Sequence, residues 1–232
     1  MQFDKHKHTS VMIQILRDIY TNSTLRNAIG FKGGTALYLL YDLPRTSVDL
    51  DFEIIKGEIS DSIKKSIAKI ASKYGEIKNI DDKRYTYLVL IVYEKYQKNL
   101  KIEISKRQTP NKFEVKNYLG TPILVAKKET LISTKLSAYL TRRKHAARDT
   151  FDLWYMLKNG FELDDQLVQF WTDQNTQSAL ENAISKTEKL NKKTMLAGLG
   201  ELVDEKQKPF IKNQLQQELL FQLNLKLKEK IA

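Results

Sequence analysis

The spacing of hydrophobic residues changes along the chain, and this change predicts two kinds of structure. In the first half, segments with helical spacing alternate with segments in which every second residue is apolar. Helices are expected over 9–22, 35–41 and 60–73, strands over 47–55, 84–94 and 99–105, and a short apolar stretch at 28–31. Thr9 or Ser10 would cap the first helix. Turn residues between the last two strands favour antiparallel pairing.

Strand patterns nearly disappear after Pro122. From there, helical spacing predicts helices over 126–143, 149–158, 164–171, 178–190, 194–203 and 209–230. The chain is therefore expected to be α+β, with an α/β core over 1–120 and a helical domain over 121–232. No Ser/Gly-rich linker separates these parts, so we expect them to pack as one unit.

Two carboxylates stand out on the strand predicted over 47–55. Residues two apart on a strand share a face, so Asp49 and Asp51 project side by side, while Leu50 and Phe52 anchor the opposite face in the core. Two carboxylates this close repel each other and need a compensating cation. Hard oxygen ligands favour Mg²⁺ or Mn²⁺. The pair therefore predicts a divalent metal site.

Glu103 is the best candidate for a third metal ligand. It lies in the strand predicted over 99–105, where Ile102 and Ile104 point inward. Glu103 and Lys101 then point to the other face, which would be the face that carries the aspartates. The alternative is a glutamate on a solvated strand face.

Gly33 and Gly34 directly precede the helix predicted over 35–41. Without side chains, their backbone N–H groups can approach an oxyanion, and the helix N-terminus adds partial positive charge. Thr35 would either cap this helix or offer its hydroxyl to phosphate. Arg45 would neutralise phosphate or brace the aspartates. A phosphate-binding corner beside a metal site favours chemistry at a nucleoside triphosphate.

The formal net charge of +11 is concentrated in the middle of the chain. Residues 56–160 hold 23 basic against 11 acidic side chains, whereas the two flanking parts are nearly balanced. Such a field attracts polyanions, nucleic acid first, although a basic surface that only aids solubility is the alternative. The chain has no cysteine, no start like a signal peptide and no apolar run long enough for a bilayer, so a soluble cytoplasmic protein is expected.

Two motifs resemble one known family. The run FKGGTALYLLYDLPRTSVDLDFEI, residues 31–54, is similar to the first motif of the AbiEii/AbiGii toxin nucleotidyltransferases. The run STKLSA at 133–138, followed by Arg142 and by ARDTFDLWY at 147–155, resembles the family's functional lysine helix and its R-D-x-x-D-L segment. The resemblance covers roughly residues 28–158.

This resemblance implies a polymerase-β-like nucleotidyltransferase core with a mixed sheet, followed by a helical C-terminal domain. It also implies a toxin of a toxin–antitoxin or abortive-infection system, with a cognate antitoxin as partner. The reaction would be Mg²⁺-dependent transfer of a nucleotide from a nucleoside triphosphate to RNA, at the 3′ end of tRNA.

The same resemblance assigns roles to individual residues. Gly33, Gly34 and Thr35 would hold phosphates, and Asp49 and Asp51 the metal. In the helical domain, Lys135 would contact the triphosphate and Asp149 would be an essential carboxylate. Arg148 and Asp152 would shape the site. The role of Glu103 rests on the strand pattern alone.

Each of these residues could instead have a purely structural or solvent-exposed role. Lys135 would otherwise be a surface lysine, and Asp149 the N-cap of the helix that follows it. His6 and His8 share a terminus that looks exposed, and no further ligand lies near for a metal. The basic cluster that ends at His145 would be a solvated turn or would contact tRNA phosphates.

Three other functions compete with the one that the resemblance implies. The first is nucleotidyl transfer to a small hydroxylated molecule, the second is non-catalytic binding of nucleic acid or a partner, and the third is transfer of a whole phosphoryl group.

Overall fold

The computed structural model describes residues 3–95, 98–142 and 146–231. These residues form two compact units. The first holds the chain up to Asp42, Thr46–Thr109 and Phe113–Ala126. The second holds Leu43–Arg45, Pro110–Lys112 and the chain from Lys127 onward. Two short segments of the N-terminal half therefore belong with the helical unit.

The first unit is built on one mixed sheet. Its strands are β1 (Ile29–Lys32), β2 (Asp49–Ile54), β3 (Glu76–Asp82), β4 (Thr86–Val92), β5 (Leu100–Ser105), β6 (Phe113–Tyr118) and β7 (Thr121–Ala126). Their order across the sheet is β3-β4-β5-β2-β1-β7-β6. The pairs β2–β5 and β1–β7 are parallel and the others antiparallel, which confirms both the α+β class and the predicted pairing of β4 with β5.

Three of these strands were not predicted, and each has a physical reason. β3 and β6 are edge strands, and β3 exposes most of its residues, so neither shows a clear apolar alternation. Pro122 and the rest of β7 lie in the part of the chain, 121–232, that was predicted to be helical. Pro122 is the second residue of that strand, and β1 pairs with β7 only at Val125, so no partner on that side needs an N–H from Pro122.

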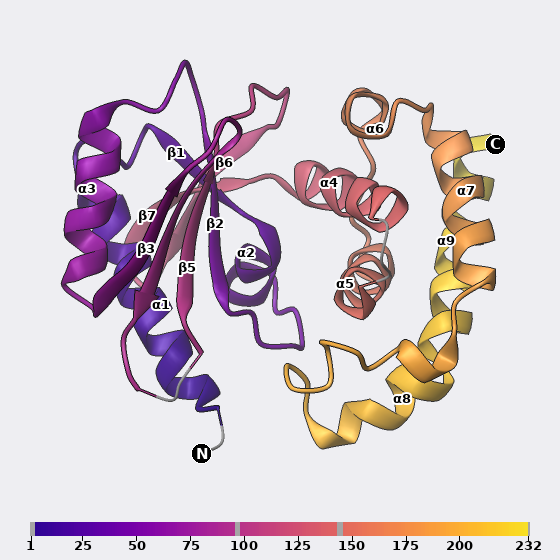
Figure 1. Ribbon diagram of the computed structural model, residues 1–232. Helices are drawn as coiled ribbons and strands as arrows, with labels where there is room; N and C mark the ends of the chain where they lie inside the picture. Colours follow the sequence, from indigo (N-terminus) through magenta and orange to yellow (C-terminus); the bar gives the residue numbers. More distant parts are fainter. Residues whose placement is uncertain (1–2, 96–97, 143–145, 232) are drawn as a thin grey trace. The chain divides into compact units, whose positions relative to one another are not determined.

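Helices α1 (Lys5–Thr21) and α3 (Asp61–Ser72) cover one face of the sheet (Figure 1). Each is capped from its own sequence: the Asp4 carboxylate accepts from the backbone N–H of Lys7 at 2.9 Å, and the Ser60 hydroxyl accepts from Ile63 at 3.3 Å. The predicted caps Thr9 and Ser10 are wrong, because α1 begins four residues earlier than expected.

The second unit is helical in the described residues. Its helices are α4 (Lys128–Thr141), α5 (Ala147–Lys158), α6 (Asp165–Thr172), α7 (Thr176–Glu188), α8 (Lys208–Asn213) and α9 (Leu215–Ile231), with short 3₁₀ turns η1 (Lys192–Thr194) and η2 (Glu205–Gln207). The helix predicted over 194–203 is wrong: this stretch is a series of turns, and Gly198 takes a positive φ of 68°. The predicted helix over 209–230 is divided at Gln214.

No helix in the described parts of the chain is apolar over a length that would cross a bilayer.

Candidate functional site

Asp49 and Asp51 lie on the sheet face opposite the core. Leu50 and Phe52, between and after them, are 0% and 1% exposed, whereas both aspartates are half-buried. The alternation therefore places the carboxylates on one side of β2, as the sequence predicted. Next to β2 runs β5, whose Lys101 ammonium lies 3.3 Å from Oδ2 of Asp49.

Glu103 is the direct strand neighbour of Asp51. The parallel register pairs Asp49 with Lys101 and Asp51 with Glu103, so all four side chains share a face. Among the described residues, however, no three acidic or histidine side chains come together in an arrangement that would hold a metal ion. The role of Glu103 as a third ligand stays a prediction.

The carboxylate of Asp51 lies directly over Gly33. A Cβ atom placed on Gly33 would be 2.5 Å from Oδ2 of Asp51, and the φ of Gly33 is 79°. Helix α2 (Gly33–Leu40) begins at this glycine, so the first backbone amides of the helix and the strand carboxylate meet at one corner. Only glycine satisfies both the backbone angle and the close approach.

Thr35 links helix α2 to strand β2. Its side chain is fully buried, and its hydroxyl donates a hydrogen bond to the backbone carbonyl of Asp49. It does not cap α2, which begins at Gly33 with Lys32 in the cap position. The hydroxyl thus fixes the start of β2 against α2, and its contact with phosphate stays a prediction.

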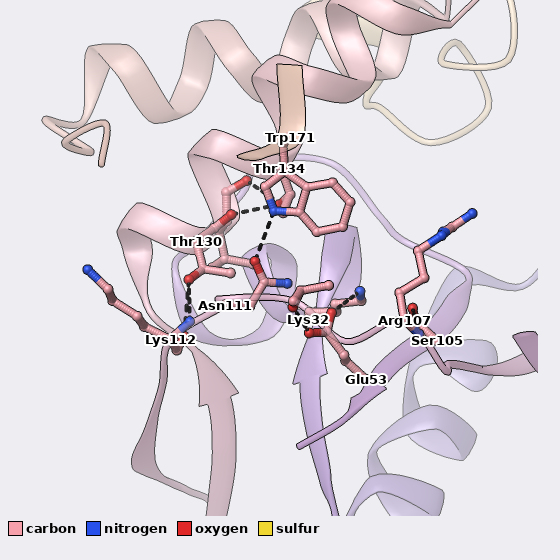
Figure 2. Close-up of polar contacts among 11 residues, drawn as sticks. Lys32, Glu53, Ser105, Arg107, Asn111, Lys112, Thr130, Thr134 and Trp171 are labelled. Carbon is pink, nitrogen blue, oxygen red and sulfur yellow. Dashed lines mark hydrogen bonds and ion pairs between the residues drawn. The ribbon is translucent and has the colours of Figure 1, made fainter. Parts of the chain in front are cut away.

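A buried ion pair continues the acidic face beyond Asp51. The Lys32 ammonium lies 2.5 Å from Oε2 of Glu53, which is 2% exposed (Figure 2). The Thr109 hydroxyl donates to Oε1 of the same carboxylate. In the antiparallel register of β1 and β2, Lys32 is the backbone neighbour of Asp51. Sequence reasoning assigned no role to this pair, although the alternation Asp49-x-Asp51-x-Glu53 already placed Glu53 on the site face.

The second unit holds a separate cluster of charges around Lys135 of α4. Its ammonium lies 3.1 Å from Oδ1 of Asp149 and 2.8 Å from Oδ2 of Asp152, both on α5. The two carboxylates are 1% and 0% exposed, and the lysine side chain is 14% exposed. Lys135 is therefore held between two buried aspartates and is not a free surface lysine.

Arg45 binds Asp152 from the other side. Its Nε and Nη2 donate to the two carboxylate oxygens at 2.6 and 2.7 Å, and the guanidinium is buried. Burial alone would raise the pKa of Asp152, but Arg45 and Lys135 outweigh it and lower that pKa to about 2. Arg45 thus braces an aspartate, as one alternative proposed, but Asp152 and not those of β2.

Asp149 lies within the first turn of α5 and does not cap it, because the helix begins at Ala147. Its Oδ2 is buried and accepts no hydrogen bond from the described residues. The Arg142 Nε atom lies 3.1 Å from that oxygen, close enough for an ion pair but without hydrogen-bond alignment. Arg148 is half-buried, and the ion pairs that the structure describes for both carboxylates come from other cations.

A family model describes nearly the whole chain. Residues 14–224 match the nucleotidyl transferase AbiEii toxin family, type IV toxin–antitoxin system. The chain belongs to this family. Membership makes it a nucleotidyltransferase, and the match covers residues of both units, from α1 to α9. No curated protein sequence matches the chain.

Solved structures share the fold of this AbiEii family member. JHP933 from Helicobacter pylori is 22% identical over 97% of this chain and 92% of its own, with a TM-score of 0.63. A candidate nucleotidyltransferase from H. pylori is 23% identical over 98% and 97%, with a TM-score of 0.65. The antibiotic-resistance factor ANT(2'')-Ia is 13% identical over 73% and 91%, with a TM-score of 0.51. The fold is therefore the predicted polymerase-β-like nucleotidyltransferase fold.

The position of His8 differs from the one predicted from the sequence. It was expected at an exposed terminus, but it is fully buried in α1. Its Nε2 donates to the Val48 carbonyl at 2.8 Å, and its Nδ1 lies 2.8 Å from the Tyr93 hydroxyl. Burial lowers the pKa of His8, so this imidazole fixes the residue before Asp49 as a neutral group. His145 of the basic cluster lies outside the described residues.

Proposed function

We propose that this nucleotidyltransferase transfers a nucleoside monophosphate from a nucleoside triphosphate to an RNA acceptor, the 3′ end of tRNA, with Mg²⁺ or Mn²⁺, and that this reaction makes it a toxin. The contact between Asp51 and Gly33 is the main support. It brings a carboxylate and the N-terminus of α2 to one corner, where a metal-bound triphosphate needs both.

The residues around Asp51 fit a hard divalent cation. Asp49, Asp51 and Glu103 supply only oxygen donors from two adjacent strands. Mg²⁺ keeps several waters and commonly takes only one or two carboxylates, so a complete cage of protein ligands is not required. A bound Mg²⁺ would neutralise the phosphates and polarise the α-phosphate. Lys101 balances part of the charge of this group through its ion pair with Asp49.

Positive groups in each unit have a part in this proposal. Lys32 precedes the glycines, and the Gly33 and Gly34 amides begin α2, so these groups would bind the phosphate tail. In the second unit, Lys135 would also bind phosphate, while Arg45 and Asp152 position its ammonium.

The proposed reaction forms one bond and breaks one. The acceptor hydroxyl oxygen bonds to the α-phosphorus, the bond from that phosphorus to the bridging oxygen breaks, and pyrophosphate leaves. The hydroxyl proton passes to a carboxylate. Asp149 is our first choice, because its Oδ2 accepts no hydrogen bond from the described residues and keeps a lone pair available. The distribution of charge, with 23 basic against 11 acidic residues over 56–160, supports a polyanionic acceptor.

The test offers the purified protein each of four α-³²P-labelled triphosphates with Mg²⁺ and total tRNA. We expect label in tRNA, and at least a thousandfold slower transfer for Asp49→Asn and Asp51→Asn. Label in small hydroxylated molecules but never in RNA would overturn the acceptor. Full activity of the double Asn variant would overturn the metal site. Expression in bacteria should arrest growth, and Asp49→Asn should relieve the arrest.

A further inference from the structure

Two arginine side chains of the first unit contact one exposed tyrosine ring. Tyr85, just before β4, is 46% exposed. The guanidinium carbon of Arg84 lies 5.0 Å from the centre of its ring, and that of Arg107 lies 5.1 Å from the same centre. Both distances are in the range of cation–π contacts. We call these three residues the Arg–Tyr–Arg cluster.

The charge of the cluster is not balanced from nearby. No carboxylate of the described residues forms an ion pair with Arg84 or Arg107. The nearby acids are occupied: Asp81 lies 3.5 Å from Lys83, and Asp82 is paired with both Lys64 and Lys106. These lysines lower the pKa of Asp82, so it stays ionised and engaged. Three lysines thus engage these two acids, and neither acid forms an ion pair with the two guanidiniums.

The cluster adjoins the acidic face of the sheet. Ser105, at the end of β5, pairs with Glu53 on one side and with Thr86 on the other. The N–H of Lys106 donates to the Tyr85 carbonyl at 2.9 Å, which ties the chain before Arg107 to the start of β4. Arg107 is four positions after Glu103, so their Cα atoms are at most about 14 Å apart. Figure 2 shows the Arg107 side chain extending away from Ser105.

We propose that the Arg–Tyr–Arg cluster binds single-stranded RNA and guides the acceptor strand toward the carboxylates of β2 and β5. Guanidiniums bind phosphates in a bidentate manner and stack on bases, and an exposed tyrosine ring offers a surface for stacking. Unbalanced positive charge beside an aromatic ring matches a chain that carries both phosphates and bases. This proposal rests on RNA being the acceptor in the proposed function.

The experiment measures the affinity of the full chain for a 5′-fluorescein-labelled 12-mer of oligouridine by anisotropy, between 50 and 300 mM salt. The variants are Arg84→Gln/Arg107→Gln, Tyr85→Ala and Tyr85→Phe. Lys192→Gln/Lys193→Gln is the control, since it removes two exposed positive charges from η1 in the other unit. All variants touch exposed side chains, and circular dichroism checks their folding.

We expect the arginine pair to weaken binding about tenfold or more at low salt and to reduce the slope of log K against log salt by about 1.4, since each phosphate contact on a single strand contributes about 0.7. Tyr85→Ala should weaken binding about fivefold or more, and Tyr85→Phe should not. The lysine control should change neither quantity.

Equal affinities for the arginine pair and the lysine control would overturn the cluster as an RNA site. So would an equal loss of binding to labelled polyglutamate, because the cluster would then serve an acidic protein. Transfer assays separate this proposal from the function. If the arginine-pair variant transfers nucleotides to RNA with an unchanged KM, the cluster is not an RNA site for the reaction, while the proposed function stands. If RNA binding depends on the cluster but no nucleotide is transferred to RNA, the proposed acceptor is wrong, while the cluster stands as an RNA site.

Discussion

The ammonium of Lys101 and the carboxylate of Asp49 form an ion pair across two parallel strands, with 3.3 Å between Nζ and Oδ2. The lysine therefore occupies the position of a cation at the predicted metal site. Exposed pairs of this kind contribute at most about 1 kcal/mol, so a divalent ion can displace it at small cost.

Lys101→Met should therefore tighten Mn²⁺ binding about twofold to fivefold, because the ion no longer competes with the lysine. Isothermal titration calorimetry or the EPR signal of free Mn²⁺ measures the change. Lys78→Met is the control, since Lys78 is an exposed lysine on β3 of the same sheet. Weaker Mn²⁺ binding in Lys101→Met than in Lys78→Met would mean that the lysine supports the metal site and does not compete with it.

Gly33→Ala should damage the site beyond the ordinary effect of alanine at a positive φ. Its Cβ would meet Oδ2 of Asp51 at 2.5 Å, so the carboxylate or α2 must shift. Gly57→Ala is a matched control: Gly57 has a φ of 68°, but a Cβ there would meet nothing within 4 Å. Both variants should lose about 1 kcal/mol of unfolding free energy to backbone strain.

Transfer activity distinguishes the two glycine variants. Gly33→Ala should lose at least tenfold in kcat/KM, because small displacements of a binding group have large effects on rate, whereas Gly57→Ala should keep its activity. Equal activity in both would show that the corner between Asp51 and α2 is not needed for the reaction.

Much of the fold followed from local patterns. The alternation Asp49-Leu50-Asp51-Phe52 predicted which face of β2 is buried, and helical spacing located α3 to within one residue at each end. Edge strands β3 and β6 escaped prediction, because their residues are selected for pairing and solubility and not for a buried face. The helix predicted over 194–203 failed because its apolar residues were counted and the cost of Gly198 was not.

The candidate site was predictable only where its parts are close in sequence. Gly33 and Asp51 meet across one helix and one turn, and the spacing of the motif indicated it. Pairs between distant residues left no local signal: Arg45 binds Asp152, 107 positions away, and Thr109 binds Glu53. Burial of such polar groups becomes visible only once the packing is known, because partners are chosen by the tertiary structure.

Asp152 should make the helical unit sensitive to acid. Its pKa in the folded protein is about 2, below the ordinary 3.8, so its contribution is complete above about pH 5 and is lost as the pH falls toward 2. The shift corresponds to about 2 kcal/mol of unfolding free energy lost between pH 5 and pH 2. Urea unfolding at each pH measures it.

The variant Asp152→Asn isolates this effect from other carboxylates. At pH 7 it should lose about 3 kcal/mol, because Arg45 and Lys135 lose a buried negative charge that both of them contact. The difference in stability between wild type and variant should shrink by about 2 kcal/mol as the pH falls from 5 to 2. A difference that stays constant over this range would show that the Asp152 pKa is not lowered by folding.

The pair Lys32 and Glu53 allows a test of whether the half-buried lysine beside Gly33 binds substrate or only stabilises the structure. Lys32→Met removes the ammonium beside a carboxylate that is 2% exposed and should cost about 3 kcal/mol of unfolding free energy. Glu53→Gln in the same chain removes the buried negative charge as well, so the double variant should regain most of that stability. This recovery makes the activity of the double variant interpretable, since its fold is intact.

If Lys32 binds the phosphate tail, the double variant should keep a triphosphate KM raised about tenfold or more, while Glu53→Gln alone stays near wild type. A purely structural lysine predicts the opposite result, a double variant whose KM and kcat recover together with its stability. The comparison works because the two roles differ in what the second substitution can repair: removing Glu53 restores electrical balance inside the protein, but no change at Glu53 supplies an ammonium group to phosphate.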